Sequence, residues 1–170
     1  MESKVKLFGH PLHQMLIVFP LGLLGTSVVF DLIHLFGSVS YASTVAYALI
    51  AAGLVGGLIA APWGTIDWLA IPAGTRAKAI GAMHGGGNVL VLLLFAASWW
   101  LRRDQIEQPP QLAWALSFCG AGLALVTAWL GGELVDRLGV GVSANANLNA
   151  RSSLKGPAEQ PSEAAQARTH

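Results

Sequence analysis

The chain has little charge for its size. Only 11% of its 170 residues are charged, against roughly 25% in an ordinary soluble domain. Apolar residues make up 54% of the chain, and the mean hydropathy is +0.55. A soluble protein covers its surface with polar groups, and this composition cannot supply them. The composition therefore argues against a soluble enzyme, and equally against a disordered protein.

Other absences narrow the range of functions. The single cysteine, Cys119, excludes an intrachain disulfide and a multi-cysteine metal or iron–sulfur site. A formal net charge of +1 leaves no basic excess, so we expect no nucleic-acid partner. The sequence contains no serine–histidine–aspartate constellation, phosphate-binding loop or dinucleotide fingerprint. We therefore predict no hydrolytic or nucleotide chemistry and no independent catalytic activity.

The chain does have four long apolar runs. They cover about residues 11–36, 42–61, 79–101 and 112–131, and a helix needs about 20 residues to cross a hydrocarbon core. None of them alternates between apolar and polar residues as barrel strands do. From residue 142 the chain is polar and cannot bury enough apolar surface to order itself. The predicted fold class is an all-α integral membrane four-helix bundle over residues 1–141, with a disordered cytoplasmic tail over 142–170.

Lysine and arginine are distributed unevenly between the two ends of this bundle. The end that holds both termini carries most of them, whereas the opposite end has only Arg102 and Arg103. Short cytoplasmic loops are enriched in these residues. We therefore predict a multi-pass protein of the bacterial inner (cytoplasmic) membrane with both termini cytoplasmic. The lipid bilayer is then its first partner.

Glycine and proline predict how the helices pack. Gly53–Gly57 and Gly81–Gly85 have the small-xxx-small spacing that lets membrane helices approach closely. In a second interpretation, Gly85 and the two glycines after it clear space for a flat ligand. Pro20 predicts a kink in the first helix because it removes a backbone hydrogen bond. The stretch 62–78 is partly apolar, and we expect a short amphipathic segment along the membrane interface there.

Ionisable residues within spans are candidates for function, and here they collect at one end. His10 and His13 begin the first helix, and His84 lies on the same side, inside the third helix. Asn88 follows His84 by four residues, so both face the same way. Glu133 follows the last helix, and Asp67 precedes the third. The opposite end has fewer such groups: Asp31 and His34, with Arg102 and Arg103 nearby.

Several of these residues carry a resemblance. The opening His10-Pro11-Leu12-His13, followed after six residues by Pro20-Leu21-Gly22, resembles that of a bacterial family of small predicted membrane proteins of unknown function. Asp67-Trp68, His84 with Asn88, and Gly131-Gly132-Glu133-Leu134 extend the resemblance over about residues 9–140. It implies a four-helix membrane domain and, since members are sometimes fused to Rieske or cytochrome c modules, a redox setting. Gln14 departs from the family pattern, in which a proline is expected.

The leading hypothesis is a redox-associated module that binds one b-type haem and takes part in electron transfer. Two histidines on facing helices at similar depth can bind haem iron axially, and His13 and His84 fit that role. Gly85 would let the porphyrin lie close. Asn88 and Glu133 would surround the ligands, and His10 is the weaker candidate for the first axial position. Electrons would leave to quinone or to a partner protein. The expected protein partners are a membrane redox partner or further copies of the chain in a homo-oligomer.

Three alternatives remain open at this stage. The same histidines with Glu133 or Asp67 could hold zinc or non-haem iron through nitrogen and oxygen. Asp31 and His34 could mark one end of a transport or proton pathway, although four helices would then need to oligomerise. Finally, the protein could be a non-catalytic anchor or scaffold of a larger complex. In that case His84 and Asn88 hold helices together, and Asp31 pairs with His34, Arg102 or Arg103.

Overall fold

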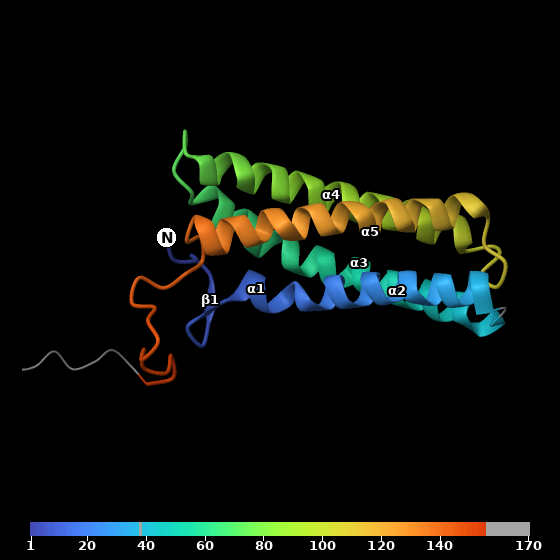
Figure 1. The fold of residues 1–170 in the computed structure, drawn as a ribbon, viewed down its shortest axis with the longest axis horizontal. Helices are drawn as coiled ribbons and strands as arrows, with labels where there is room; N and C mark the ends of the chain where they lie inside the picture. The colour runs from blue at the N-terminus through green and yellow to red at the C-terminus, as the bar shows by residue number, and fades with distance from the viewer. Residues whose placement is uncertain (38, 156–170) are drawn as a thin grey trace, which may run out of the picture.

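The computed structural model describes residues 1–37 and 39–155 of the chain. It contains four helical stretches long and apolar enough to cross a membrane, which confirms the predicted all-α membrane fold. Figure 1 shows them running along one common axis. The elements are β1 (Lys6–Leu7), β2 (His10–Pro11), α1 (Leu12–Leu16), α2 (Val18–Gly37), α3 (Ser40–Leu69), α4 (Arg76–Arg102), α5 (Gln111–Gly132) and the π-helix η1 (Glu133–Arg137).

Of the predicted disordered tail, only the first part falls within the described residues. Residues 142–155 form turns and irregular chain, without helix or strand. The remainder of that prediction, from residue 156 onward, lies outside the described residues.

The first span is broken at one residue. Helix α1 ends at Leu16 and α2 begins at Val18, so that Ile17 separates them. Pro20 has no N–H to donate to the carbonyl of Leu16, and its ring crowds that carbonyl. The kink predicted from Pro20 is thus present, one turn before the proline. It leaves α1 as a separate five-residue helix that carries His13.

The second span is longer than predicted. Residues 62–69 do not form a separate interfacial segment, because α3 continues through Pro62 to Leu69. A proline inside a membrane helix is tolerated where neighbouring groups compensate for the lost hydrogen bond. The end of α3 is held by α4, since the indole N–H of Trp68 donates to the carbonyl of Lys78 at 3.1 Å and Lys78 Nζ donates back to the carbonyl of Trp68 at 2.7 Å.

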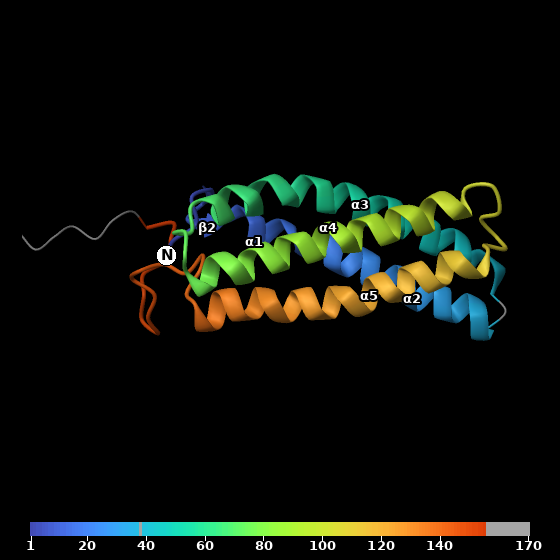
Figure 2. The ribbon, with the colours of Figure 1, turned by 90° about the horizontal axis from the view of Figure 1, so that it is seen from above.

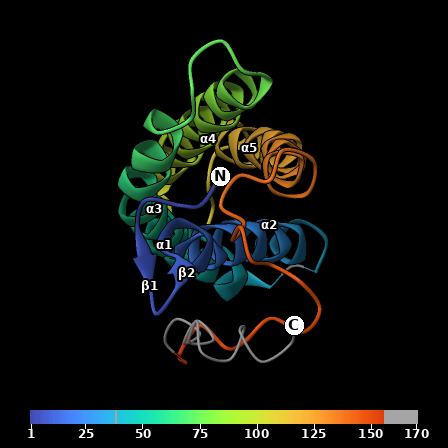
Figure 3. The same cartoon turned by 90° about the vertical axis from the view of Figure 1, so that its left-hand side faces the viewer.

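The four spans form two helical hairpins. Contacts are most extensive between α2 and α3 and between α4 and α5, while α3–α4 and α2–α5 join the two hairpins more sparsely. Figures 2 and 3 show this arrangement from above and from one end. Glycines permit the close approach. A Cβ on Gly53 would lie 2.6 Å from the side chain of Leu24, and one on Gly120 would lie 2.9 Å from Phe95.

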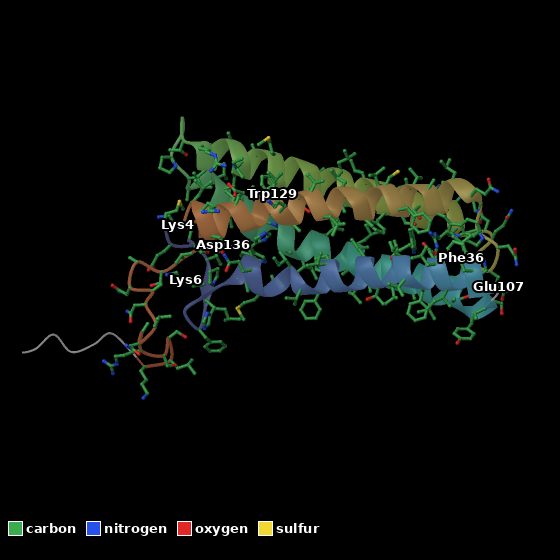
Figure 4. The ribbon with its side chains drawn as sticks, viewed as in Figure 1. Lys4, Lys6, Phe36, Glu107, Trp129 and Asp136 are labelled. Carbon is green, nitrogen blue, oxygen red and sulfur yellow. The ribbon has the colours of Figure 1, made fainter. Side chains whose placement is uncertain are left out.

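The core is small and the outer surface is apolar. The buried centre of the core consists of Leu24, Ile50, Val91 and Phe95. Large apolar side chains such as Leu58, Leu125 and Val55 face outward along the spans, which is the arrangement expected of helices in contact with lipid. In Figure 4 charged side chains gather at the two ends, with Lys4, Lys6 and Asp136 at one end and Glu107 at the other.

Candidate functional site

His13 is held at the start of the first span by helix α3. Its Nδ1 lies 3.0 Å from the carbonyl oxygen of Ala60. The ring lies directly against Gly64, where a Cβ would approach the His13 Cε1 to 2.7 Å. Gly64 thus provides a space that any other residue would fill. The histidine is half-buried and linked to α3, so it belongs to the first hairpin.

His84 is held in the same manner by the second hairpin. Its Nδ1 lies 2.9 Å from the carbonyl oxygen of Thr127 on α5, and its ring lies against Gly131, 3.1 Å from the position of a Cβ there. The Asn88 amide donates to the carbonyl of His84 at 2.9 Å, and Thr127 Oγ1 donates to Asn88 Oδ1 at 3.0 Å. As predicted, Asn88 and His84 lie on the same face of α4.

These contacts determine the proton positions on both rings. A carbonyl oxygen only accepts hydrogen bonds, so Nδ1 of each histidine must carry the proton. In a neutral imidazole Nε2 then holds a lone pair and can accept a proton or bind a metal. The nearest polar group to Nε2 of His84 is the Asn88 amide nitrogen, at 3.3 Å. For Nε2 of His13 no hydrogen bond is present within residues 1–37 and 39–155.

The two histidines come from different hairpins and lie at the same end of the bundle. His13 binds α3 of the first hairpin, and His84 binds α5 of the second. We call this end of the bundle, which also holds the N-terminus, the histidine end. Figure 3 views the molecule onto this end.

The other predicted site residues lie farther from this pair or have other partners. His10 is exposed on β2, with Nε2 3.3 Å from the hydroxyl of Ser153. Gly85 is exposed, and a Cβ there would meet nothing within 4 Å, so it lies on the outer face of α4. Glu133 forms an ion pair with Arg76 at 2.7 Å, which connects η1 to the start of α4.

The N-terminal segment lies across the histidine end. Asp67, which falls in α3 rather than in a loop, accepts hydrogen bonds from the hydroxyl of Ser3 and the N–H of Lys4, both at 2.7 Å. Glu2 accepts from the N–H of Ala144 at 3.0 Å. Its ion pair with Lys6 and this backbone bond lower the pKa of Glu2 to about 2. The segment therefore joins the end of α3 to the chain that follows η1.

The opposite end of the bundle contains a buried ion pair. Arg102 Nη1 and Nη2 donate to the two carboxylate oxygens of Asp31 at 2.5 and 2.7 Å, and both side chains are 0% exposed. Of the three partners predicted for Asp31, Arg102 is the one that binds it in the structure. The pair joins α2 of the first hairpin to α4 of the second. We call this the ion-pair end.

Two serines complete the network around this pair. Ser117 on α5 donates to Asp31 Oδ2 at 3.0 Å, and Ser98 accepts from Arg102 Nε at 3.2 Å. Ser98 itself donates to the carbonyl of Ala113 at 2.6 Å. Each nitrogen of the guanidinium group thus has an acceptor, as a buried charge in a membrane requires.

Aromatic pairs flank the network on both sides. Tyr47 of α3 stacks on Trp99 of α4 with ring centroids 5.2 Å apart, and His34 of α2 lies 5.9 Å from Trp114 of α5. Each pair joins one helix of the first hairpin to one of the second. The ion-pair end is therefore joined by charge at its centre and by aromatic contact at its edges.

Sequence reasoning missed several residues that hold these groups in place. Thr127, Ser98 and Ser117 are hydroxyl residues inside apolar runs, and each binds one of the ionisable groups or its partner. That isolation was the available signal, because a hydroxyl inside a membrane needs a hydrogen-bond acceptor. No comparable signal identified Gly64, since its role depends on which helix α1 approaches.

Comparison with known proteins places this architecture in a family. No curated protein and no solved structure matches the chain. One family model does match, over residues 9–144, which include all four spans, both histidines of the site and the buried ion pair. The chain is therefore a member of the DUF2231 family of predicted membrane proteins.

Proposed function

We propose that this protein is a membrane module that binds one b-type haem between its two hairpins, with His13 and His84 as the axial ligands. The observation that supports it is the matched state of the two rings. Each donates Nδ1–H to a backbone carbonyl and retains Nε2 as a ligand atom. Metal-binding histidines are generally oriented by such a bond from the other ring nitrogen.

The donor set fits a cofactor that needs two protein ligands. A six-coordinate haem takes four nitrogens from its own macrocycle and only two from the protein. Gly64 and Gly131 hold the two rings against their helices, where any side chain would displace them. Bound haem would supply one-electron chemistry at this end of the bundle. The chain would hold the ligands, exclude water and set the polarity around them.

These residues fit a zinc or non-haem iron site less well than a haem site. Structural zinc sites take four protein ligands and catalytic ones take three. Within the described parts of the chain, no group of three or more histidine, cysteine or acidic residues is placed to hold a metal ion. Glu133 pairs with Arg76, and Asp67 holds Ser3 and Lys4, so the two nearest candidate carboxylates have other partners.

A scaffold function is the second candidate, and the same hydrogen bonds support it. His13 links α1 to α3, and His84 links α4 to α5, without any cofactor. Such bonds stabilise membrane helices by about 0.6 to 2 kcal/mol each. In this view the histidines are structural and the protein anchors a larger membrane assembly.

An absorption spectrum separates the two candidates. The protein is expressed with haem available, purified in detergent and measured as isolated and after dithionite reduction. Haem ligation predicts a reduced Soret band and a sharp α-band at about one haem per chain. His13→Ala and His84→Ala should each remove the low-spin spectrum. No band in folded protein supplied with haem overturns the haem proposal and leaves the scaffold.

Two other histidines provide matched controls. His34 lies at the ion-pair end, with Nδ1 3.3 Å from the carbonyl of Val39, and His10 is exposed on β2. His34→Ala and His10→Ala should both retain the spectrum. If either variant loses the bands while His13→Ala keeps them, the axial ligands are assigned wrongly.

The placement in the cell belongs to the same proposal. We place the protein in a bacterial inner membrane with the histidine end on the cytoplasmic side, where electrons would pass to a membrane redox partner. The excess of lysine and arginine at this end supports that orientation. A topology reporter fused after Asn145 should report a cytoplasmic location. A periplasmic signal would reverse the orientation without affecting the haem site.

A further inference from the structure

The hairpin that precedes the first span has an unusual turn. Strands β1 and β2 are antiparallel, with Leu7 paired to His10, and Phe8 and Gly9 form the turn between them. Their φ angles are 50° and 84°, as the tightest two-residue hairpins require. Glycine and asparagine suit such positions, whereas a bulky side chain is strained there. Phe8 is the one non-glycine residue with positive φ in the described part of the chain.

The tip of this hairpin is apolar and uncovered. Phe8 is 70% exposed and Leu7 is 43% exposed. Beside the turn lies the segment after η1, because Ser153 touches Gly9 and its hydroxyl is 3.3 Å from His10 Nε2. The next residue, Leu154, is 76% exposed. We call Leu7, Phe8 and Leu154 the hairpin patch. In water, an uncovered side chain such as Phe8 forgoes the favourable free energy of burial.

The position of the hairpin indicates what covers the patch. Its second strand ends at Pro11, and the first span begins at Leu12 without a linker. In Figure 1 the hairpin lies level with the start of α4, and in Figure 3 it projects sideways beyond α1. The first residue of a spanning helix lies near the bilayer surface. A hairpin that extends sideways from that residue lies over the lipid that surrounds the bundle.

The charges near the patch fit the same environment. Lys6 forms an ion pair with Glu2 at the base of the hairpin, on the strand side away from the turn. Arg151 and Lys155 are exposed on the segment that touches Gly9. Interfacial elements combine apolar side chains that enter the acyl boundary with lysine and arginine among the headgroups. The hairpin patch and its neighbours have both.

We propose that the hairpin patch inserts into the membrane interface, with Phe8 as its anchor among the lipids. Burial of Phe8 in the interface offsets the strain of its left-handed backbone. The anchor also fixes the depth at which α1 enters the membrane, and α1 carries His13. The proposal does not depend on haem, because it concerns the contact between protein and lipid.

Nitroxide accessibility in lipid nanodiscs tests the insertion. Single-cysteine variants are made in a Cys119→Ala background, since Cys119 is exposed on the outer face of α5. Phe8→Cys is compared with Leu58→Cys, on the lipid-facing side of α3, and with Gln105→Cys, in the loop between α4 and α5. Oxygen partitions into lipid and a nickel chelate into water. The ratio of their collision rates at position 8 should be several-fold above that at 105 and approach that at 58. A ratio equal to that at 105 overturns the proposal and points to a protein partner.

A second variant tests the anchor without a nitroxide label, because a label at position 8 alters the turn itself. Asparagine adopts the left-handed conformation more readily than phenylalanine, so Phe8→Asn relieves the strain and removes the anchor together. If lipid holds the tip, amide hydrogen exchange in the hairpin should become several-fold faster in nanodiscs. If the hairpin is only a turn, exchange should become slower, and that result contradicts the anchor.

Discussion

The polar side chains at the two ends of the bundle bind in opposite ways, across the hairpins at one end and within each hairpin at the other. At the ion-pair end Asp31 and Arg102 bind each other across the hairpins, and serines occupy the remaining positions of the network. At the histidine end His13 and His84 each bind a helix of their own hairpin and retain Nε2. A network with every group satisfied holds helices together. Nε2 of His13 has no hydrogen bond within the described residues, and Nε2 of His84 contacts the Asn88 amide at 3.3 Å, an arrangement that suits ligand binding. The difference supports a structural role for the ion-pair end and the binding role that we propose for the histidine end.

The largest effect should come from separating the ion pair. Arg102→Met leaves a buried, uncompensated carboxylate on Asp31, which costs about 3–5 kcal/mol. Unfolding in a detergent titration followed by circular dichroism measures this loss. Replacing both residues, as in Asp31→Leu with Arg102→Met, should cost less than the single change. If the double variant is the less stable of the two, the pair is not the source of the stability.

Glycine substitutions should have the next largest effect, and α4 offers a matched pair. A Cβ at Gly87 would lie 2.6 Å from Thr127 Cγ2, whereas one at Gly85 would meet nothing. Gly87→Ala should destabilise the bundle by about 1–3 kcal/mol through overpacking. Gly85→Ala should be neutral, or stabilising through its helix propensity. Equal thermal shifts for the two variants would contradict the packing described for α4 and α5.

Removing a histidine should destabilise the bundle less than breaking the ion pair. Without haem, His84→Ala loses one hydrogen bond to Thr127, worth about 0.6 to 2 kcal/mol in a membrane. With haem bound, the loss grows because ligand binding stabilises the folded state. The thermal unfolding of wild type and of His84→Ala is therefore measured with and without haem, and the two proteins are compared in each condition. A loss as large as that of Arg102→Met in haem-free protein would mean that the histidine end is also structural.

The smallest effect concerns the segment across the histidine end. The pKa of Glu2 is lowered to about 2 by its contacts with Lys6 and the N–H of Ala144. A carboxyl group whose pKa is lowered by folding stabilises the folded state at pH values above its ordinary pKa. That stability is lost as the pH falls through about 2. The groups are exposed, so Glu2→Gln should leave global unfolding unchanged at neutral pH. It should only speed exchange of the Ala144 amide, which hydrogen-exchange mass spectrometry detects.

The sequence predicted the framework because the bilayer imposes it. A run of about 20 apolar residues can only be a span, so the four runs predict four membrane helices. The short connection at 37–41 predicts that the first two are antiparallel neighbours. Helical spacing was enough to place Asn88 beside His84 on one face. The partner of Asp31 remained one of three, since that choice depends on how far α4 extends.

What could not be predicted depends on contacts between distant segments. Residues 62–69 were expected along the interface, yet contacts with Lys78 and Gly81 hold Trp68 in a continuous α3. The sequence predicts that Gly85 clears space for a flat ligand, but Gly85 lies on the outer face of α4. That position depends on which side of α4 packs against α5. The backbone carbonyl of Thr127 lies 2.9 Å from His84 Nδ1, and no residue type signals a contact made by a backbone carbonyl.

The separation of Asp31 from Arg102 along the chain has a consequence for biogenesis. The arginine follows the aspartate by 71 residues and belongs to the other hairpin. During synthesis the first hairpin is therefore complete before Arg102 has been made. Ion pairing can then occur only when the hairpins dock side by side. The pair is thus a marker of docking between the two hairpins, and a chain interrupted after α3 would leave Asp31 without its partner.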